Sequence, residues 1–110
     1  MQRVAYHRLA AAELIKSARF YDRRRMGLGD EFLSAVEAVQ ELIRTQPLLG
    51  RRGLLDTLSF RTKRFPFRIV YELQPDRIWI VAVAHCVLHL NIRASSTTNQ
   101  SRFMAGNKVC

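Results

Sequence analysis

The stretch that decides the fold is Arg61-Thr62-Lys63-Arg64-Phe65-Pro66-Phe67-Arg68-Ile69-Val70-Tyr71, followed closely by Ile78-Trp79-Ile80-Val81-Ala82-Val83-Ala84-His85. From Phe65 onward apolar and polar side chains alternate, which is the pattern of a half-buried strand. The second segment is apolar at nearly every position, which predicts a central strand covered on both faces. Strict alternation assigns its residues to two rows: Ile78, Ile80, Ala82 and Ala84 on one face, and Trp79, Val81, Val83 and His85 on the other.

Two helices are predicted before these strands. Apolar residues recur at helical spacing over residues 10–25, and Met26-Gly27-Leu28-Gly29 ends that helix. A second helix begins near Asp30, where negative charge suits a helix N-terminus, and Pro47 stops it. With a connection of about four residues, the two helices form an antiparallel hairpin. Residues 3–9 alternate weakly and predict a first strand.

These elements predict an α+β fold of order β-α-α-β-β-β, formed as a single domain over residues 1–90. The two-helix hairpin packs on one face of a small, mainly antiparallel sheet. The second face, which includes Val70, is then left uncovered, and an exposed apolar patch beyond roughly a few hundred Å² usually marks an interface. We therefore expect a partner protein. Residues 91–110 are polar and without pattern, so we expect a disordered or atypical tail.

Composition limits the class of protein. The net charge is +9, because 18 Lys and Arg stand against 9 Asp and Glu, and this excess favours polyanions or an acidic protein as partners. No run approaches the roughly 18 apolar residues that span a bilayer. The N-terminus has no apolar signal core, so we expect a cytoplasmic protein without membrane association. Cys86 and Cys110 make no disulfide framework and are expected to be free thiols.

Four segments stand in a fixed order within residues 3–89: Ala12-Glu13-Leu14 through Phe20-Tyr21-Asp22, Gly27-Leu28-Gly29-Asp30-Glu31-Phe32-Leu33, Phe65-Pro66-Phe67-Arg68-Ile69-Val70-Tyr71, and Ile80-Val81-Ala82-Val83-Ala84-His85. Their order and spacing resemble the RelE/ParE superfamily of type II toxin–antitoxin toxins, and the last two segments look more like its ParE branch. The resemblance implies a toxin that inhibits growth, stabilises plasmids and forms a hetero-oligomer with a cognate antitoxin. That antitoxin would be small, with an acidic or amphipathic C-terminal segment.

The superfamily divides by target. RelE-like members cleave messenger RNA on the ribosome, and ParE-like members are associated with poisoning of DNA gyrase. Ribonuclease members use basic residues on the central strands plus an arginine and a tyrosine near the C-terminus. Here Arg61 and Arg68 match the strand positions, whereas Cys86 and Ile92 occupy the arginine and tyrosine positions. Because RNA cleavage needs groups that take and donate a proton, we expect a toxin that binds its target and is not an enzyme.

The expected target-binding residues are the cations of the basic hairpin: Arg61, Lys63, Arg64 and Arg68. Residues 51–68 hold six cations and a single acid, Asp56. The functional interpretation is that these cations contact the target or acidic residues of the antitoxin. A solvated basic face is the alternative for any one of them.

Two further readings stay open. A ribosome-dependent RNA endonuclease would use Arg61, Arg68 and His85, although a histidine at a strand end is more often structural. After His85 the chain lacks the arginine pair, proline and aromatic pair typical of the ParE branch, so a non-toxic remnant that still binds antitoxin is the other reading. We expect no cofactor and no metal site, because the histidines lack ligand spacing.

Overall fold

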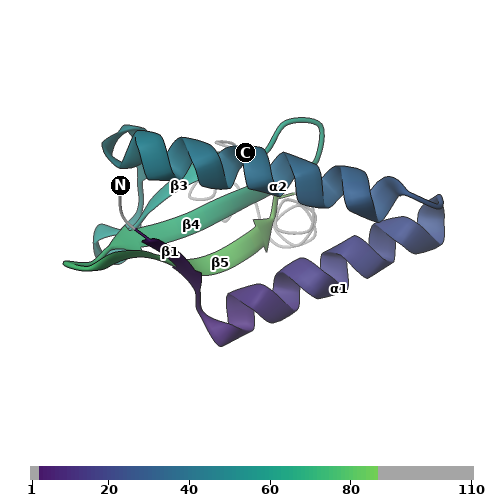
Figure 1. Ribbon diagram of the computed structural model, residues 1–110, viewed down its shortest axis with the longest axis horizontal. Helices are drawn as coiled ribbons and strands as arrows, with labels where there is room; N and C mark the ends of the chain where they lie inside the picture. The colour runs from purple at the N-terminus through teal and green to yellow at the C-terminus, as the bar shows by residue number, and fades with distance from the viewer. Residues whose placement is uncertain (1–2, 87–110) are drawn as a thin grey trace, which may run out of the picture.

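The computed structural model describes residues 3–86, and the expected tail over residues 91–110 lies outside them. The chain order is β1 (Arg3–Tyr6), α1 (Arg8–Arg24), α2 (Leu28–Thr45), the 3₁₀ turn η1 (Pro47–Leu49), β2 (Arg51–Arg52), the 3₁₀ turn η2 (Leu54–Asp56), β3 (Leu58–Arg61), β4 (Phe67–Leu73) and β5 (Arg77–His85). Figure 1 shows these elements as a helical hairpin and a sheet. The predicted α+β fold is confirmed, with the two-residue β2 as an addition.

The strands form one five-stranded sheet in the order β1-β5-β4-β3-β2. β1 runs parallel to β5, and the other neighbouring pairs are antiparallel. β5 therefore lies between β1 and β4, as the apolar character of both its faces predicts. The turn between β4 and β5 is closed by the Gln74 N–H, which donates to the Arg77 carbonyl at 2.9 Å.

The pairing of β5 with β4 contains a register shift. Before the shift, Ile78 and Ile80 are fully buried toward the helices; after it, Val83 is buried on that same face, with 2% of its surface exposed. Ala82 and Ala84 pair with Val70 and Arg68 and so belong to the opposite face. The expected row of Ile78, Ile80, Ala82 and Ala84 is therefore wrong, because one extra residue in a strand reverses the alternation.

The helix α1 supports β5 where the shift occurs. β1 pairs with β5 only as far as Ile80, so the backbone of Val83 lies beyond the last β1 partner. There the Val83 N–H donates to Glu13 Oε1 at 2.9 Å. An unpaired buried N–H would be costly, so this side chain takes the place of a strand neighbour.

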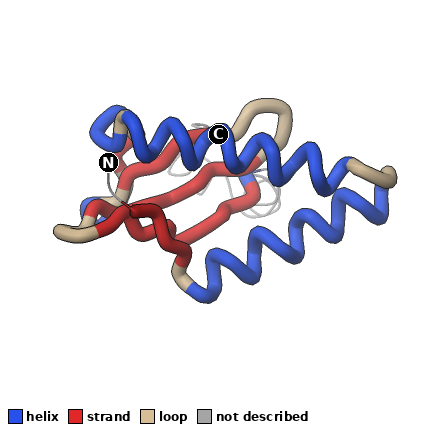
Figure 2. The backbone as a smooth tube through the Cα atoms, in the orientation of Figure 1, coloured by secondary structure: helices blue, strands red, loops and turns tan. Residues whose placement is uncertain are grey.

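Both α-helices lie on the same face of the sheet (Figures 1 and 2). The core lies between these layers and includes an aromatic group in which Tyr21 contacts Phe65, and Phe32 contacts Phe67, each with ring centroids 4.9 Å apart. Eight buried side chains are the largest of this core: Tyr71, Phe32, Phe67, Ile43, Ile69, Ile78, Ile80 and Val36. Within residues 3–86 no α-helix covers the opposite face, as expected (Figure 1).

Two features bear on the expected environment of the protein. Cys86 is buried and its sulfur is in a disulfide, so the expectation of a free thiol is wrong for this residue. Cys110 lies outside the described residues. No helix in the described part of the chain has the length and apolarity needed to cross a membrane.

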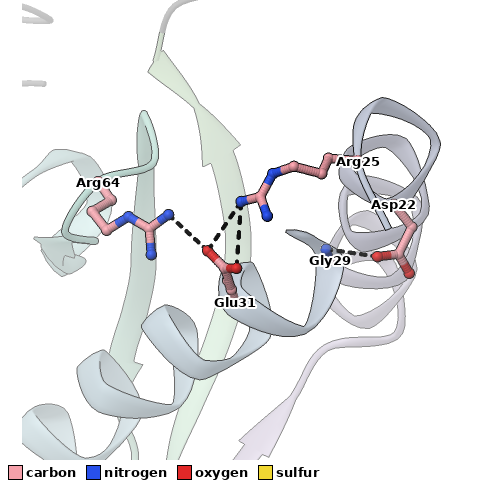
Figure 3. A network of polar contacts seen from close by, with 5 residues as sticks. All are labelled: Asp22, Arg25, Gly29, Glu31 and Arg64. Atoms are coloured by element: carbon pink, nitrogen blue, oxygen red, sulfur yellow. Dashed lines mark hydrogen bonds and ion pairs between the residues drawn. The ribbon is translucent and has the colours of Figure 1, made fainter. Parts of the chain in front are cut away.

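Gly29 lets α1 and α2 approach closely at the tip of the hairpin. Its N–H donates to Asp22 Oδ1 at 2.7 Å (Figure 3). A Cβ atom at this position would overlap the carbonyl oxygen of Ala18 and lie 2.7 Å from Asp22 Cγ. The hairpin therefore needs glycine here for space.

We predict that Gly29→Ala lowers the free energy of unfolding by about 1–3 kcal/mol, the usual cost of overpacking. The higher helix propensity of alanine, worth about 0.8–1 kcal/mol, offsets part of that cost. Urea denaturation measures the change. Ser34→Ala, at an exposed position of the same helix, is the control, and equal losses in the two variants would contradict the role of Gly29.

Candidate functional site

The face of the sheet opposite the helices carries three arginines on adjacent strands. Arg61 of β3 and Arg68 of β4 are direct cross-strand partners. Arg51 of β2 pairs with Ser59, which lies two residues before Arg61 on β3. Paired residues point to the same face, and so do residues two apart on one strand. Arg51, Arg61 and Arg68 therefore share one face, and we call them the arginine cluster.

Arg68 has the most restricted side chain of the arginine cluster. It is half-buried, and its Nε donates to the Ser59 hydroxyl at 2.9 Å. Burial lowers the pKa of Arg68, and the like charges of Arg51 and Arg61 lower that pKa further. The charges of Arg51 and Arg61 thus both act on the Arg68 guanidinium. Such a group of planar donors suits carboxylate or phosphate oxygens, which can accept two hydrogen bonds from one arginine.

The rest of this face has apolar side chains at its centre, and an acid and a further cation toward the turn between β4 and β5. Val70 and Ala82 are half-buried partners across β4 and β5. The guanidinium carbon of Arg77 lies 4.0 Å from the ring centroid of Trp79. Glu72 pairs with Trp79 and accepts a hydrogen bond from the Gln74 amide at 3.0 Å. This end of the face therefore carries both an acid, Glu72, and a cation, Arg77.

Arg64 does not join the arginine cluster. Its guanidinium donates to Glu31 Oε1 of α2 at 2.8 Å, and Glu31 also pairs with Arg25 at 3.4 Å (Figure 3). The backbone of Arg64 has a φ of 72°, a left-handed conformation. Arg64 therefore attaches the loop between β3 and β4 to the second helix. Lys63 is exposed on the same loop.

His85 points to the other face of the sheet. It pairs with Phe67, and the two rings meet edge to face with centroids 4.7 Å apart. Burial lowers the pKa of His85. Arg68 pairs with the neighbouring Ala84, so its side chain and that of His85 leave the sheet on opposite sides. The three residues expected for a ribonuclease are thus not brought together.

The sequence was compared with models of known protein families, and one model matches. The family model of the ParE toxin of the type II toxin–antitoxin system parDE matches residues 4–86. The chain belongs to this ParE toxin family. The match confirms the resemblance drawn from the four sequence segments, including its ParE-like branch.

A solved structure of a chromosomal ParDE toxin–antitoxin system from P. aeruginosa has the same fold as this ParE-family chain. The TM-score is 0.60 at 19% sequence identity, over 77% of this chain and 96% of that chain. At this identity the likeness concerns the fold. No curated protein matches the chain.

Two residues of this surface, Arg51 and Ser59, are missing from the residues predicted by sequence. The alternation of Ser59 and Arg61 with Leu58 and Phe60 is a signal that could have identified Ser59. Arg51 has no such signal, because β2 has only two residues and alternation needs a longer run. Within residues 3–86 no group of three or more His, Cys, Asp or Glu could hold a metal ion.

We predict that Arg61→Gln raises the free energy of unfolding by about 0.5 kcal/mol at low ionic strength, because it removes a like charge beside Arg68. Salt should reduce this gain, since it screens exposed charges. Arg64→Gln is the matched comparison and should destabilise, because it removes the ion pair with Glu31. Thermal denaturation at two salt concentrations measures both effects. A change of the same sign in both variants would contradict the assigned roles.

The Glu31 carboxyl gives a prediction about pH. The hydrogen bond from Arg64 lowers the pKa of Glu31, and the charge of Arg25 adds to the effect. A lowered pKa means that the carboxylate adds stability above the ordinary glutamate pKa and loses it as pH falls through the lowered one. Arg64→Gln should therefore raise the pKa of Glu31 in an NMR titration, whereas Arg23→Gln should not. An unchanged pKa in Arg64→Gln would refute the contact.

Proposed function

We propose that this ParE-family chain is a cytoplasmic toxin that acts by binding a DNA gyrase-type target, and that a cognate antitoxin neutralises it. The observation that carries this proposal is the arginine cluster on the face of the sheet that bears no helix. Cations concentrated on a half-apolar surface favour tight binding of an acidic surface and speed its association. Of the four cations expected to bind the target, Arg61 and Arg68 are the two that lie in this cluster.

Binding without chemistry fits the groups around the arginine cluster. Arginine keeps its proton at any physiological pH and so cannot act as a base. A proton carrier would have to come from elsewhere, and His85 leaves the sheet on the opposite side from Arg68. His7 is held as the N-cap of α1, where its Nδ1 accepts from the Leu9 N–H at 2.9 Å. Neither histidine supports general acid–base catalysis beside the arginines.

Two observations support an antitoxin partner and a hetero-oligomer. The similar fold of P. aeruginosa comes from a ParDE toxin–antitoxin system. In addition, Val70, Trp79 and Ala82 leave an apolar strip on a face that no α-helix of residues 3–86 covers. A segment with apolar and acidic side chains would cover this strip and pair with the arginine cluster. Neutralisation would then follow because antitoxin and target compete for the same cations.

The second candidate is a ribosome-dependent RNA endonuclease. One observation favours it: Arg61 and Arg68 are adjacent on central strands, where they could hold a phosphate and stabilise charge as it develops. Such an enzyme would need a proton carrier supplied by the ribosome or the RNA.

We predict that induced expression of the chain stops growth and that the purified chain inhibits supercoiling by DNA gyrase. The double variant R61Q/R68Q should need at least about tenfold more protein for the same inhibition, because it loses two contacts of the kind worth about 1.5 kcal/mol each. R23Q/R24Q removes the same charge from the exposed end of α1 and is the matched control.

The readouts separate the candidates. Gyrase inhibition and DNA-damage signalling with intact transcripts support the proposal. New transcript ends at fixed codon positions, lost in R61Q/R68Q, would replace it with the endonuclease. Normal growth on induction, while an antitoxin still binds, would identify a non-toxic remnant. Equal activity of R61Q/R68Q and R23Q/R24Q would remove the arginine cluster from the mechanism.

A further inference from the structure

The outer side of α1 carries a row of cations that the arginine cluster does not include. Arg8, Lys16 and Arg19 are exposed, and the exposed Ala12 lies between Arg8 and Lys16. Residues three or four apart on a helix are neighbours on its surface, so these four residues follow one another along one side of α1. We call them the basic row. Figure 1 shows α1 along one side of the molecule, in the helical layer and away from the sheet face that bears no helix.

The acids of α1 do not neutralise the basic row, because both are engaged with backbone groups of other elements. Glu13 accepts an N–H of β5 at 2.9 Å, and Asp22 accepts an N–H of α2 at 2.7 Å. In the part of the chain that the structure describes, no member of the basic row forms an ion pair. Its positive charge is therefore available to an anion from outside the chain.

The stability of α1 does not account for the basic row. Arg8 is the first residue of the helix, and the first turn holds no acid, although the helix dipole favours negative charge at that end. Lys16 and Arg19 are like charges one turn apart, which costs about 0.2–0.5 kcal/mol. Arg23 and Arg24 differ, because cations in the last turn suit the dipole. The basic row thus destabilises the free helix, and a bound anion would offset that cost.

The positions of the apolar side chains argue against a membrane surface as the partner. A helix that binds a membrane buries an apolar face and keeps its cations toward the polar side. In α1 the order is reversed, because 3.6 residues per turn place the cations at the middle of the exposed side. Leu9, which is 59% exposed, and Ile15, which is 51% exposed, lie on opposite flanks of the basic row.

The aromatic ring beside the basic row argues against single-stranded nucleic acid. Bases of a single strand stack on exposed aromatic faces. The Phe20 ring already has the guanidinium carbon of Arg24 at 4.9 Å from its centroid. The basic row therefore suits phosphate groups and not unstacked bases.

The spacing of the cations matches the groove of a DNA duplex. Arg8 and Lys16 are eight positions apart in α1, a rise of about 12 Å at about 1.5 Å per residue. The major groove of B-DNA is about 12 Å wide, with a phosphate backbone on each side. With α1 across the groove, Arg8 contacts one backbone, and Lys16 and Arg19 contact the other. Ala12 then lies over the groove, where there is no phosphate. The major groove of duplex RNA is narrow and deep, so the spacing favours DNA.

We propose that the basic row of α1 binds duplex DNA through the phosphate backbones on the two sides of the major groove. The contacts position the chain on DNA and read no bases, so the affinity depends on salt concentration and not on sequence. This proposal goes beyond the proposed function and does not rest on it, because it concerns α1 and not the arginine cluster.

The test uses the purified chain and a fluorescein-labelled DNA duplex of about 20 base pairs, in anisotropy titrations between about 50 and 200 mM salt. K16Q/R19Q should bind at least about tenfold more weakly at the lower salt concentration, and its salt slope should fall by about two, one for each lost phosphate contact. R3Q/R52Q removes the same charge from exposed positions on β1 and β2 and should keep the slope. K16R/R19K keeps both charges and should bind as the unchanged chain does.

Several results would overturn the proposal. Equal affinity and equal salt slope of K16Q/R19Q and R3Q/R52Q would show that net charge alone accounts for binding. Equal affinity for an RNA duplex of the same sequence would contradict the match to the DNA major groove. Sedimentation with vesicles of anionic lipid, lost in K16Q/R19Q while the duplex does not bind, would assign the basic row to a membrane surface. Polyglutamate that binds as tightly as the duplex would assign it to an acidic protein. The assay contains no gyrase, so failure of the gyrase proposal leaves this result unaffected.

Discussion

The packing of both helices against a single face of the sheet is the constraint on which the rest of this structure depends. Phe32 of α2 contacts Phe67 of β4, and the apolar row of β4 and β5 is buried in this core. Residues on the alternate row must then face away from the helices. In β3 and β4 that row includes Arg61 and Arg68, so the rule that builds the core also brings the cations together.

A second consequence comes from the register shift in β5. Under strict alternation, His85 would share a face with Trp79, which is the face of the arginine cluster. The extra residue reverses the alternation, so His85 meets Phe67 on the helix side. Glu13 supports this arrangement, because its carboxylate accepts the Val83 N–H just after the shift. One inserted residue thus places His85 and the arginine cluster on opposite faces of the sheet.

The sequence predicts the fold and half of the candidate site, for reasons that differ between residues. Arg61 and Arg68 are predictable because alternation within their own strands places them on the polar row. The position of Arg64 depends on Glu31, 33 residues away, and on a left-handed backbone that no period reveals. The face to which His85 points depends on a bulge, and an apolar run of sequence does not reveal where a bulge lies. Patterns of period two or 3.6 report local geometry, and these two failures both arise from contacts beyond that range.

Two features of the molecule are energetically unfavourable in the free protein. Burial lowers the pKa of Arg68, and the like charges of Arg51 and Arg61 lower it further, so an anion that binds there relieves a repulsion. The loop over residues 47–56 keeps Leu54 and Leu55 exposed to water and holds Leu55 in an unfavourable backbone conformation. The Tyr71 and Thr57 hydroxyls donate to the Pro47 and Leu54 carbonyls, so contacts within the chain hold this loop in place.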